Sequence, residues 1–193
     1  MASLRSEVSR SLKARGYRQF ERMHLLRVDG EFSVWVDTGP LESRTDIAPS
    51  VGLRHEGVEH LVPELLGVDC FDWTATVGSN VGYVLAGTYR RWVSPAPVAD
   101  VLAAIDIGLE RMKQFMPLDR LPAAWSIPGA QTPGWRYHEI VAYYLLGDES
   151  KVHLSIEAAR ASLCKTPGEV CQQFLDFERR LIGRGYGSRR GEA

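Results

Sequence analysis

The sequence lacks the features that usually mark a membrane protein or a secreted, disulfide-rich protein. Its longest apolar stretches, such as Ile140 to Leu146, are too short to span a bilayer. Residues 1–7 contain no apolar segment of the kind found in a secretory signal. Only three cysteines are present, Cys70, Cys164 and Cys171, and such an odd, sparse set is typical of reduced thiols in a cytosol. These absences predict a cytoplasmic protein without a membrane segment.

An excess of charge of one sign is also missing. The chain has 23 Lys and Arg residues against 24 Asp and Glu residues, which gives a net charge of −1 at pH 7. A chain with this balance has no overall field that attracts nucleic acid or an anionic membrane. Arginines do cluster with aromatic residues in three segments, 10–22, 90–92 and 179–190, a composition that can bind single-stranded nucleic acid. Nucleic-acid binding through these Arg-rich segments is therefore a second alternative function.

No enzyme motif passes a check of its spacing. The segment from His55 to His60 resembles a zinc-protease motif, in which two histidines four positions apart project from one helical face. Here the separation is five, which places the two side chains roughly 140° apart on a helix. We interpret the segment as a charged, solvated loop with Glu56 and Glu59 as its polar face. The segment Gly78-Ser79-Asn80 lacks the lysine and the strand-to-helix context of a phosphate loop, and we interpret it as a turn.

The sequence therefore predicts no catalytic residue, no metal site and no cofactor, and it favours a protein that is not an enzyme. The alternative is an enzyme or small-molecule sensor whose polar groups converge only in the fold, in a pocket between sheet and helices. The candidates for this pocket are Asp37, His55, Glu56, His138 and Glu139. Cys164 and Cys171 are seven residues apart, but Thr166-Pro167-Gly168 breaks any helix between them, so we interpret them as two buried thiols.

Strand-like patterns and turns dominate the first half of the chain. Leu4, Val8 and Leu12 recur every four residues and predict a short helix that ends at Gly16 and leans on a sheet. Asp29-Gly30 is a favoured hairpin turn between two alternating segments. The elements expected here are a hairpin of 23–28 and 31–37, a strand over 46–53 interrupted by Pro49, a helix over 58–66, and a second hairpin of 71–77 and 81–93.

Helical periodicity dominates the second half. The amphipathic pattern predicts a long helix over 98–116 and two further helices over 137–146 and 149–163. Thr166-Pro167-Gly168-Glu169 has the spacing of a capping box, and Val170, Phe174, Phe177 and Leu181 mark the buried stripe of a last helix. The fold class is therefore α+β: an N-terminal helix and an antiparallel sheet of about five strands, followed by a C-terminal helical subdomain. The regions expected are 1–94 for helix and sheet, 95–182 for helices packed on it, and 183–193 for a flexible tail.

Two short stretches resemble known families. The leading helix that ends near Arg15-Gly16-Tyr17, the strand end Val36-Asp37-Thr38-Gly39 and the segment Asp46-Ile47-Ala48-Pro49 resemble small bacterial α+β domains, some of which look like immunity proteins of toxin systems. The resemblance covers the first half of the chain and brings no functional residues with it. The segment from Ala142 to Asp148 resembles the helix junction of tetratricopeptide-like repeats, but a single unit predicts a helical hairpin instead of an array.

Tryptophan and arginine give the leading hypothesis for function. Trp35 alternates with Phe32, Val34 and Val36, so it lies on the opposite face of its strand. Tryptophan and arginine often anchor protein interfaces. The residues proposed to bind a partner are Trp35, Trp73, Trp92, Arg90 and Arg91. The sequence thus favours a non-catalytic cytosolic protein that binds another protein, such as an immunity-type inhibitor or an adaptor.

Overall fold

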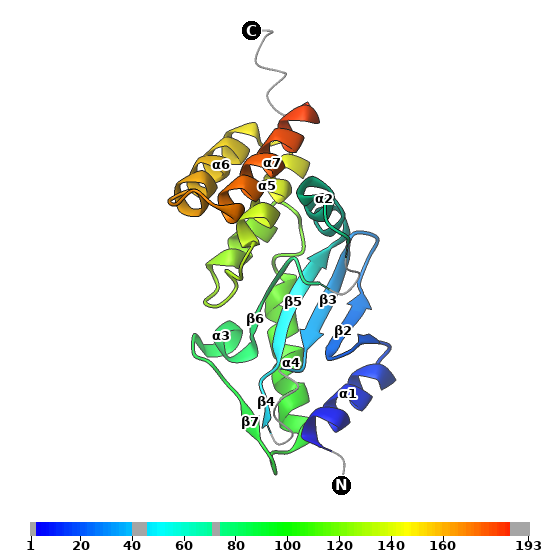
Figure 1. The fold of residues 1–193 in the computed structure, drawn as a ribbon. Coiled ribbons are helices and arrows are strands. Elements are labelled where there is room, and N and C mark those ends of the chain that lie inside the picture. The colour runs from blue at the N-terminus through cyan, green and yellow to red at the C-terminus, as the bar shows by residue number, and fades with distance from the viewer. Residues whose placement is uncertain (1–2, 40–45, 71–73, 186–193) are drawn as a thin grey trace. The chain divides into compact units, whose positions relative to one another are not determined.

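The chain is α+β, as the sequence predicts. The computed structural model describes residues 3–39, 46–70 and 74–185. It shows an N-terminal helix, a five-stranded antiparallel sheet and a set of C-terminal helices (Figure 1). The chain forms two compact units: a sheet unit of residues 1–56 and 72–133, and a helical unit of residues 57–71 and 134–193. This division differs from the boundary expected near residue 95, because the helix that begins at Val98 groups with the sheet.

The main sheet has the strand order β1-β2-β3-β5-β6, and each neighbouring pair is antiparallel. Its strands are β1 (Arg18–Phe20), β2 (Met23–Arg27), β3 (Phe32–Asp37), β5 (Ser50–His55) and β6 (Val77–Asn80). A second, two-stranded sheet pairs β4 (Asp46–Ile47) with β7 (Trp92–Val93). The predicted first hairpin is confirmed as β2 and β3, and Asp29 Oδ1 closes its turn by accepting the N–H groups of Glu31 and Phe32. The strand expected over 46–53 is split at Pro49 into β4 and β5.

One face of the main sheet carries the core of the sheet unit, and we call it the inner face. Val34 of β3 is paired with Leu53 of β5, and both side chains are buried. Helices α1 (Leu4–Ala14) and α4 (Val98–Lys113) lie on this face (Figure 1). The buried stripe of α1 is the predicted one, Leu4, Val8 and Leu12.

A glycine lets α4 approach the sheet closely. A Cβ atom at Gly108 would lie 2.8 Å from Cγ2 of Val81 and 3.1 Å from Cγ2 of Val51. Such distances are shorter than ordinary van der Waals contact, so only glycine fits without movement of its neighbours. The 3-10 helix η1 (Leu121–Ser126) follows α4 and buries Trp125 within the same unit.

The second predicted hairpin is wrong. Gly78-Ser79-Asn80, expected to be a turn, is part of strand β6, and the helix α3 (Val81–Ala86) follows directly. Asn80 begins this helix, because its side chain accepts a hydrogen bond from the backbone N–H of Gly82 at 3.0 Å. Gly78 is paired with Gly52 of β5 inside the sheet. A glycine followed by serine and asparagine is typical of a turn, and the sequence does not reveal that Gly78 is paired with Gly52 of another strand. This explains why a turn was predicted in place of strand β6.

The helical unit contains α2 (Glu56–Leu66), α5 (Trp135–Leu145), α6 (Glu149–Leu163) and α7 (Glu169–Gly183). The first residue of α2, Glu56, is the last residue of the first segment of the sheet unit. Helix α6 contacts both α5 and α7 (Figure 1). Tyr137 packs edge-on against Phe177, with ring centroids 4.8 Å apart, and Phe174 completes the aromatic cluster. Phe174, Phe177 and Leu181 are buried as predicted, whereas Val170 is 56% exposed. No helix of the described residues is long and apolar enough to cross a membrane.

The prediction of reduced thiols is wrong for two of the three cysteines. Cys164 and Cys171 form a disulfide, and the cysteine content therefore gives no support to a cytoplasmic location. The break at Thr166-Pro167-Gly168 reverses the chain and brings the two Cα atoms to 4.6 Å from each other. The expected capping box does not form, since Gly168 precedes α7 and provides no side-chain cap. Of the expected tail, Gly183 is the last residue of α7, and residues 186–193 lie outside the described residues.

We expect Gly108→Ala to destabilise the sheet unit. Alanine favours a helix over glycine by about 1 kcal/mol, but forcing a methyl group into this contact costs about 1–3 kcal/mol, so the net change is a loss. Urea unfolding measures it. Gly183→Ala is the matched control, because a Cβ there meets no atom within 4 Å. An equal or higher stability of Gly108→Ala would contradict the close approach of α4.

We expect the double substitution Cys164→Ser and Cys171→Ser to destabilise the helical unit. Closing a loop with a sequence separation of 7 restricts the unfolded chain, and its loss costs about 2–3 kcal/mol. Urea unfolding with and without a reductant measures the effect. The Cys70→Ser protein should keep the full response to reductant, because Cys70 is a free cysteine. A reductant effect of equal size in the double variant would show that this disulfide does not form.

Candidate functional site

The face of the main sheet opposite α1 and α4, here called the outer face, has an aromatic centre. The register aligns Leu25, Trp35, Gly52 and Gly78 across four neighbouring strands. A Cβ atom at Gly78 would lie 3.2 Å from Cζ3 of Trp35, so the indole ring lies against Gly78. Glycine at this position leaves room for the ring, and Trp35 remains partly exposed.

A small hollow lies beside this centre, and we call it the arginine hollow. Its volume is about 80 Å³. It is lined by Arg18, Phe20, Leu25, Arg27, Ser33, Arg54 and Glu56. Leu25, Ser33 and Arg54 are the buried residues of its lining. Arg18 and Arg27 line it from the two neighbouring strands β1 and β2.

The three arginines of the hollow are held in different ways. Arg54 is buried, with Nε 3.2 Å from Oε2 of Glu56, and it also donates to the carbonyl of Thr74. Arg27 donates from Nε and from its terminal nitrogen to the carbonyls of Asp29 and Gly30, at 2.9 and 2.7 Å. The backbone therefore orients this guanidinium but does not neutralise its charge.

Arg18 and Arg27 are like charges on neighbouring strands. The Arg18 guanidinium lies 5.0 Å from the ring centroid of Phe20. Arg18 is paired with Leu25, and Arg27 is two residues further along β2, so the two arginines are diagonal neighbours roughly 7–8 Å apart at Cα. Within the described part of the chain, no carboxylate lies within 4.0 Å of either guanidinium. An anion in the hollow would relieve this repulsion.

The residues predicted to bind a partner are divided between the two sheets. Trp35 lies on the outer face of the main sheet, while Trp92 belongs to β7 of the small sheet and is only 7% exposed. Arg90 lies 4.4 Å from the ring centroid of Trp92, and Arg91 is 3.5 Å from a carboxylate oxygen of Asp46. Trp73 lies outside the described residues. The structure therefore brings Arg90 and Trp92 together but places Trp35 in another sheet.

The pocket candidates in the sheet unit do not converge. Asp37 and His55 lie at opposite ends of β3, because Asp37 is paired with Ser50 and Phe32 with His55, a separation of roughly 17 Å along the strands. Burial raises the pKa of the Asp37 carboxyl, although a hydrogen bond from Gly39 and the charge of Arg22 partly oppose this. His55 packs edge-on against Phe32 on the inner face. The carboxylate of Glu56 instead lines the arginine hollow.

One pocket candidate of the helical unit, His138, pairs with Glu59, a buried residue that was not among the candidates. His138 Nε2 lies 3.2 Å from Oε1 of Glu59, and the carbonyl of Gly134 lies 3.2 Å from Nδ1. Glu59, expected on a solvated loop, is 2% exposed because the segment is the helix α2. Burial lowers the pKa of His138, but the hydrogen bond and charge of Glu59 outweigh it, so the pKa is raised. Burial also raises the pKa of the neighbouring Glu139.

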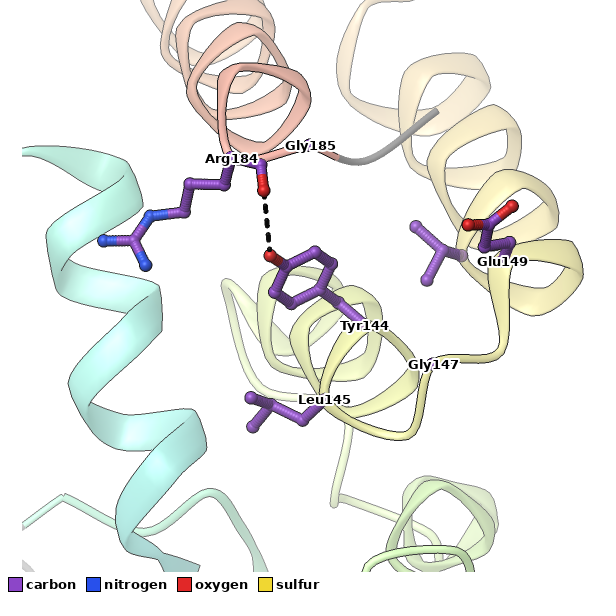
Figure 2. A pocket seen from close by; sticks show the side chains of 7 residues that line it. Tyr144, Leu145, Gly147, Glu149, Arg184 and Gly185 are labelled. Atoms are coloured by element: carbon purple, nitrogen blue, oxygen red, sulfur yellow. Dashed lines mark hydrogen bonds between the residues drawn. The ribbon is translucent and has the colours of Figure 1, made fainter. Parts of the chain in front are cut away.

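The helical unit also has a larger hollow, shown in Figure 2. Its volume is about 310 Å³, at the lower end of the range of small-molecule sites. It is lined by Tyr144, Leu145, Gly147, Glu149, Val152, Arg184 and Gly185. None of these residues was predicted from the sequence, since the hollow forms where the ends of α5, α6 and α7 meet. The resemblance of the segment from Ala142 to Asp148 to a repeat-type helix junction was the sequence feature that fell in this region.

The polar residues of the described segments do not form a metal centre. No group of three or more His, Cys, Asp or Glu side chains among them could hold a metal ion. No protein family, curated protein or solved structure matches the chain. The likeness to immunity-type domains therefore remains a prediction from short segments.

We expect the helical unit to lose stability as the pH rises through the pKa of His138. A histidine whose pKa is raised by folding stabilises the protein below its unfolded pKa, and this contribution disappears above its folded pKa. His138→Gln should remove this pH dependence and, by removing the charged His138 partner of the buried Glu59 carboxylate, cost about 3 kcal/mol near pH 6. Urea unfolding between about pH 6 and pH 9 measures both effects.

The control for this experiment is His153→Gln, because His153 is an exposed histidine in the same unit. It should retain the pH dependence of the unaltered protein. Burial lowers the pKa of His24 in the sheet unit, so the contribution of His24 to stability increases as the pH rises. Both variants and the unaltered protein contain His24, so its contribution cancels when their pH profiles are compared. A His138→Gln protein with an unchanged pH profile would contradict a role for the pair.

Proposed function

We propose that this is a non-catalytic binding protein that recognises an acidic surface of another protein through the outer face of its sheet. The observation that carries the proposal is the pair Arg18 and Arg27, two guanidinium groups on one face that have no described carboxylate within 4.0 Å, although the Asp29 carboxylate interacts with Arg27 from a greater distance. An immunity-type inhibitor or an adaptor fits this description. Both act by covering a partner and neither needs a reacting group.

The composition of the outer face supports a protein interface. Tryptophan and arginine are the residue types most often found at the energetic centres of interfaces. Trp35 packs against Gly78, so part of its side-chain freedom is already lost before a partner covers it. Arg27 is already oriented by two backbone carbonyls, and a planar guanidinium matches a carboxylate with two parallel hydrogen bonds. The face is therefore organised before a partner arrives.

A protein partner fits this face better than nucleic acid. Nucleic acid requires a stripe of positive charge that follows many phosphates. Here the charge of Arg54 is balanced by Glu56, which leaves two arginines around a hollow of about 80 Å³. The net charge of the whole chain is −1. One or two carboxylates of a folded partner satisfy such a site, and a polyanion does not gain from it.

The proposal can be tested by reversing the charge of the hollow. The tagged full-length protein and its Arg18→Glu, Arg27→Glu double variant are purified in parallel from the cells that express the chain, at near-physiological salt. We expect a stoichiometric protein partner with the unaltered chain. The double variant should retain at least about tenfold less of it, because the new carboxylates repel an acidic surface.

Arg10→Glu with Lys13→Glu is the matched control, since both residues are exposed on α1 and the change in charge is the same. This variant should retain the partner. Equal recovery by all three proteins would contradict the assignment of the outer face. Material that is lost on nuclease treatment would instead support the nucleic-acid alternative.

A further inference from the structure

The hollow of the helical unit is bounded by ends of three helices. Tyr144 and Leu145 lie at the end of α5, Glu149 is the first residue of α6, and Arg184 directly follows α7. Tyr144 donates from its hydroxyl to the backbone carbonyl of Arg184 at 3.5 Å, which ties the end of α5 to the end of α7 (Figure 2). The walls of the hollow thus come from rigid elements, and the site is formed without a ligand.

The two charged side chains of the hollow differ in whether they are paired. The guanidinium of Arg184 forms an ion pair with Glu64 of α2, and Figure 2 shows its side chain extended toward that helix. Glu149 has no cation within 4.0 Å among the residues that the structure describes. The positive charge is therefore already balanced by a carboxylate, whereas no described cationic side chain pairs with Glu149.

The backbone adds negative potential to the same place. Helices α5 and α7 both end at the hollow, and the last carbonyl groups of a helix carry the negative end of its dipole. The Tyr144 hydroxyl satisfies one of these carbonyl groups. Helix α6 begins at the hollow, and its positive end lies beside the Glu149 carboxylate. The negative ends of α5 and α7 add to this carboxylate, so the sum of the charges favours a cation over an anion.

Apolar groups complete the lining. Val152 is 1% exposed at the inner wall, and Leu145 and the Tyr144 ring add apolar surface on the opposite side. A fully hydrated inorganic ion gains nothing from such walls. An alkylammonium group gains from both halves of the site, because its charge faces the carboxylate while its carbon chain covers the apolar wall.

We propose that the hollow binds a small organic cation with an aliphatic chain and a primary ammonium group. A free amine and a lysine side chain of another protein present the same chemistry, and a volume of about 310 Å³ limits either to one short chain. This site lies in the helical unit and does not rest on the binding function proposed for the outer face of the sheet.

The test uses the full-length protein labelled with nitrogen-15, near pH 7, where an alkylamine is fully protonated. The probes are n-pentylamine, neutral n-pentanol and pentanoate, which share one carbon chain and differ in charge. We expect saturable shifts in the amide signals of Gly147, Glu149 and Gly185 with pentylamine up to about 10 mM, and at least about tenfold weaker binding of the other two. Nα-acetyl-lysine amide as a fourth probe shows whether a lysine side chain is also accepted.

Glu149→Gln keeps the shape of the side chain and removes its charge, so pentylamine should bind at least about tenfold more weakly. Glu157→Gln is the matched control, because Glu157 is exposed on the same helix and already paired with Arg160. Both variants should retain the remaining amide spectrum, which shows that they fold. Equal responses to pentylamine and pentanol, unchanged binding by Glu149→Gln, or no shift with any probe would each overturn the proposal.

Discussion

The packing of α4 against β5 is the contact on which the sheet unit depends. Gly108 allows the helix to approach the sheet closely. The helix covers one face of β3 and β5, and this fixes which of their side chains are buried beneath it. Because side chains alternate along a strand, the burial of Val51 and Leu53 under α4 leaves Gly52 and Arg54 on the other side. The arginine hollow and the contact of Trp35 with Gly78 thus lie on the face opposite the one that this helix covers.

The sequence predicted the elements whose patterns are local. Helix α6 has the bounds expected from its periodicity, and α4 begins where the prolines before Val98 indicate. The wrong predictions concern residue types that occur in two kinds of environment, such as glycine in turns and in strands. Gly78 looks like a turn residue, yet it lies inside a strand because the Trp35 ring of another strand occupies the space above it. Glu59 looks solvated, yet it is buried, and His138 on a later helix pairs with its carboxylate.

The candidate sites were harder to predict for the same reason. The arginine hollow combines residues of β1, β2, β3 and β5, so its existence depends on the pairing of Arg18 with Leu25 and of Ser33 with Arg54. No single-sequence pattern specifies such a register. Trp35 was recognised because its position opposite Val34 and Val36 is a local property of one strand. The hollow beside Glu149 depends on three helix ends, and nothing in the spacing of its residues reveals that they meet.

The helical unit is discontinuous in the chain, and this has a consequence for how the protein is made. Helix α2 is synthesised inside the sheet sequence, but Arg180, which donates to the carbonyl of Leu65, follows 115 positions later. Until the ribosome releases α5, the His138 side chain that pairs with Glu59 is absent. In a nascent chain, the residues of α2 are therefore synthesised well before the helices that cover them. Contacts between residues so far apart in the sequence form slowly. No single cut in the chain separates two complete units, so neither unit can be obtained whole by truncating the chain at one position.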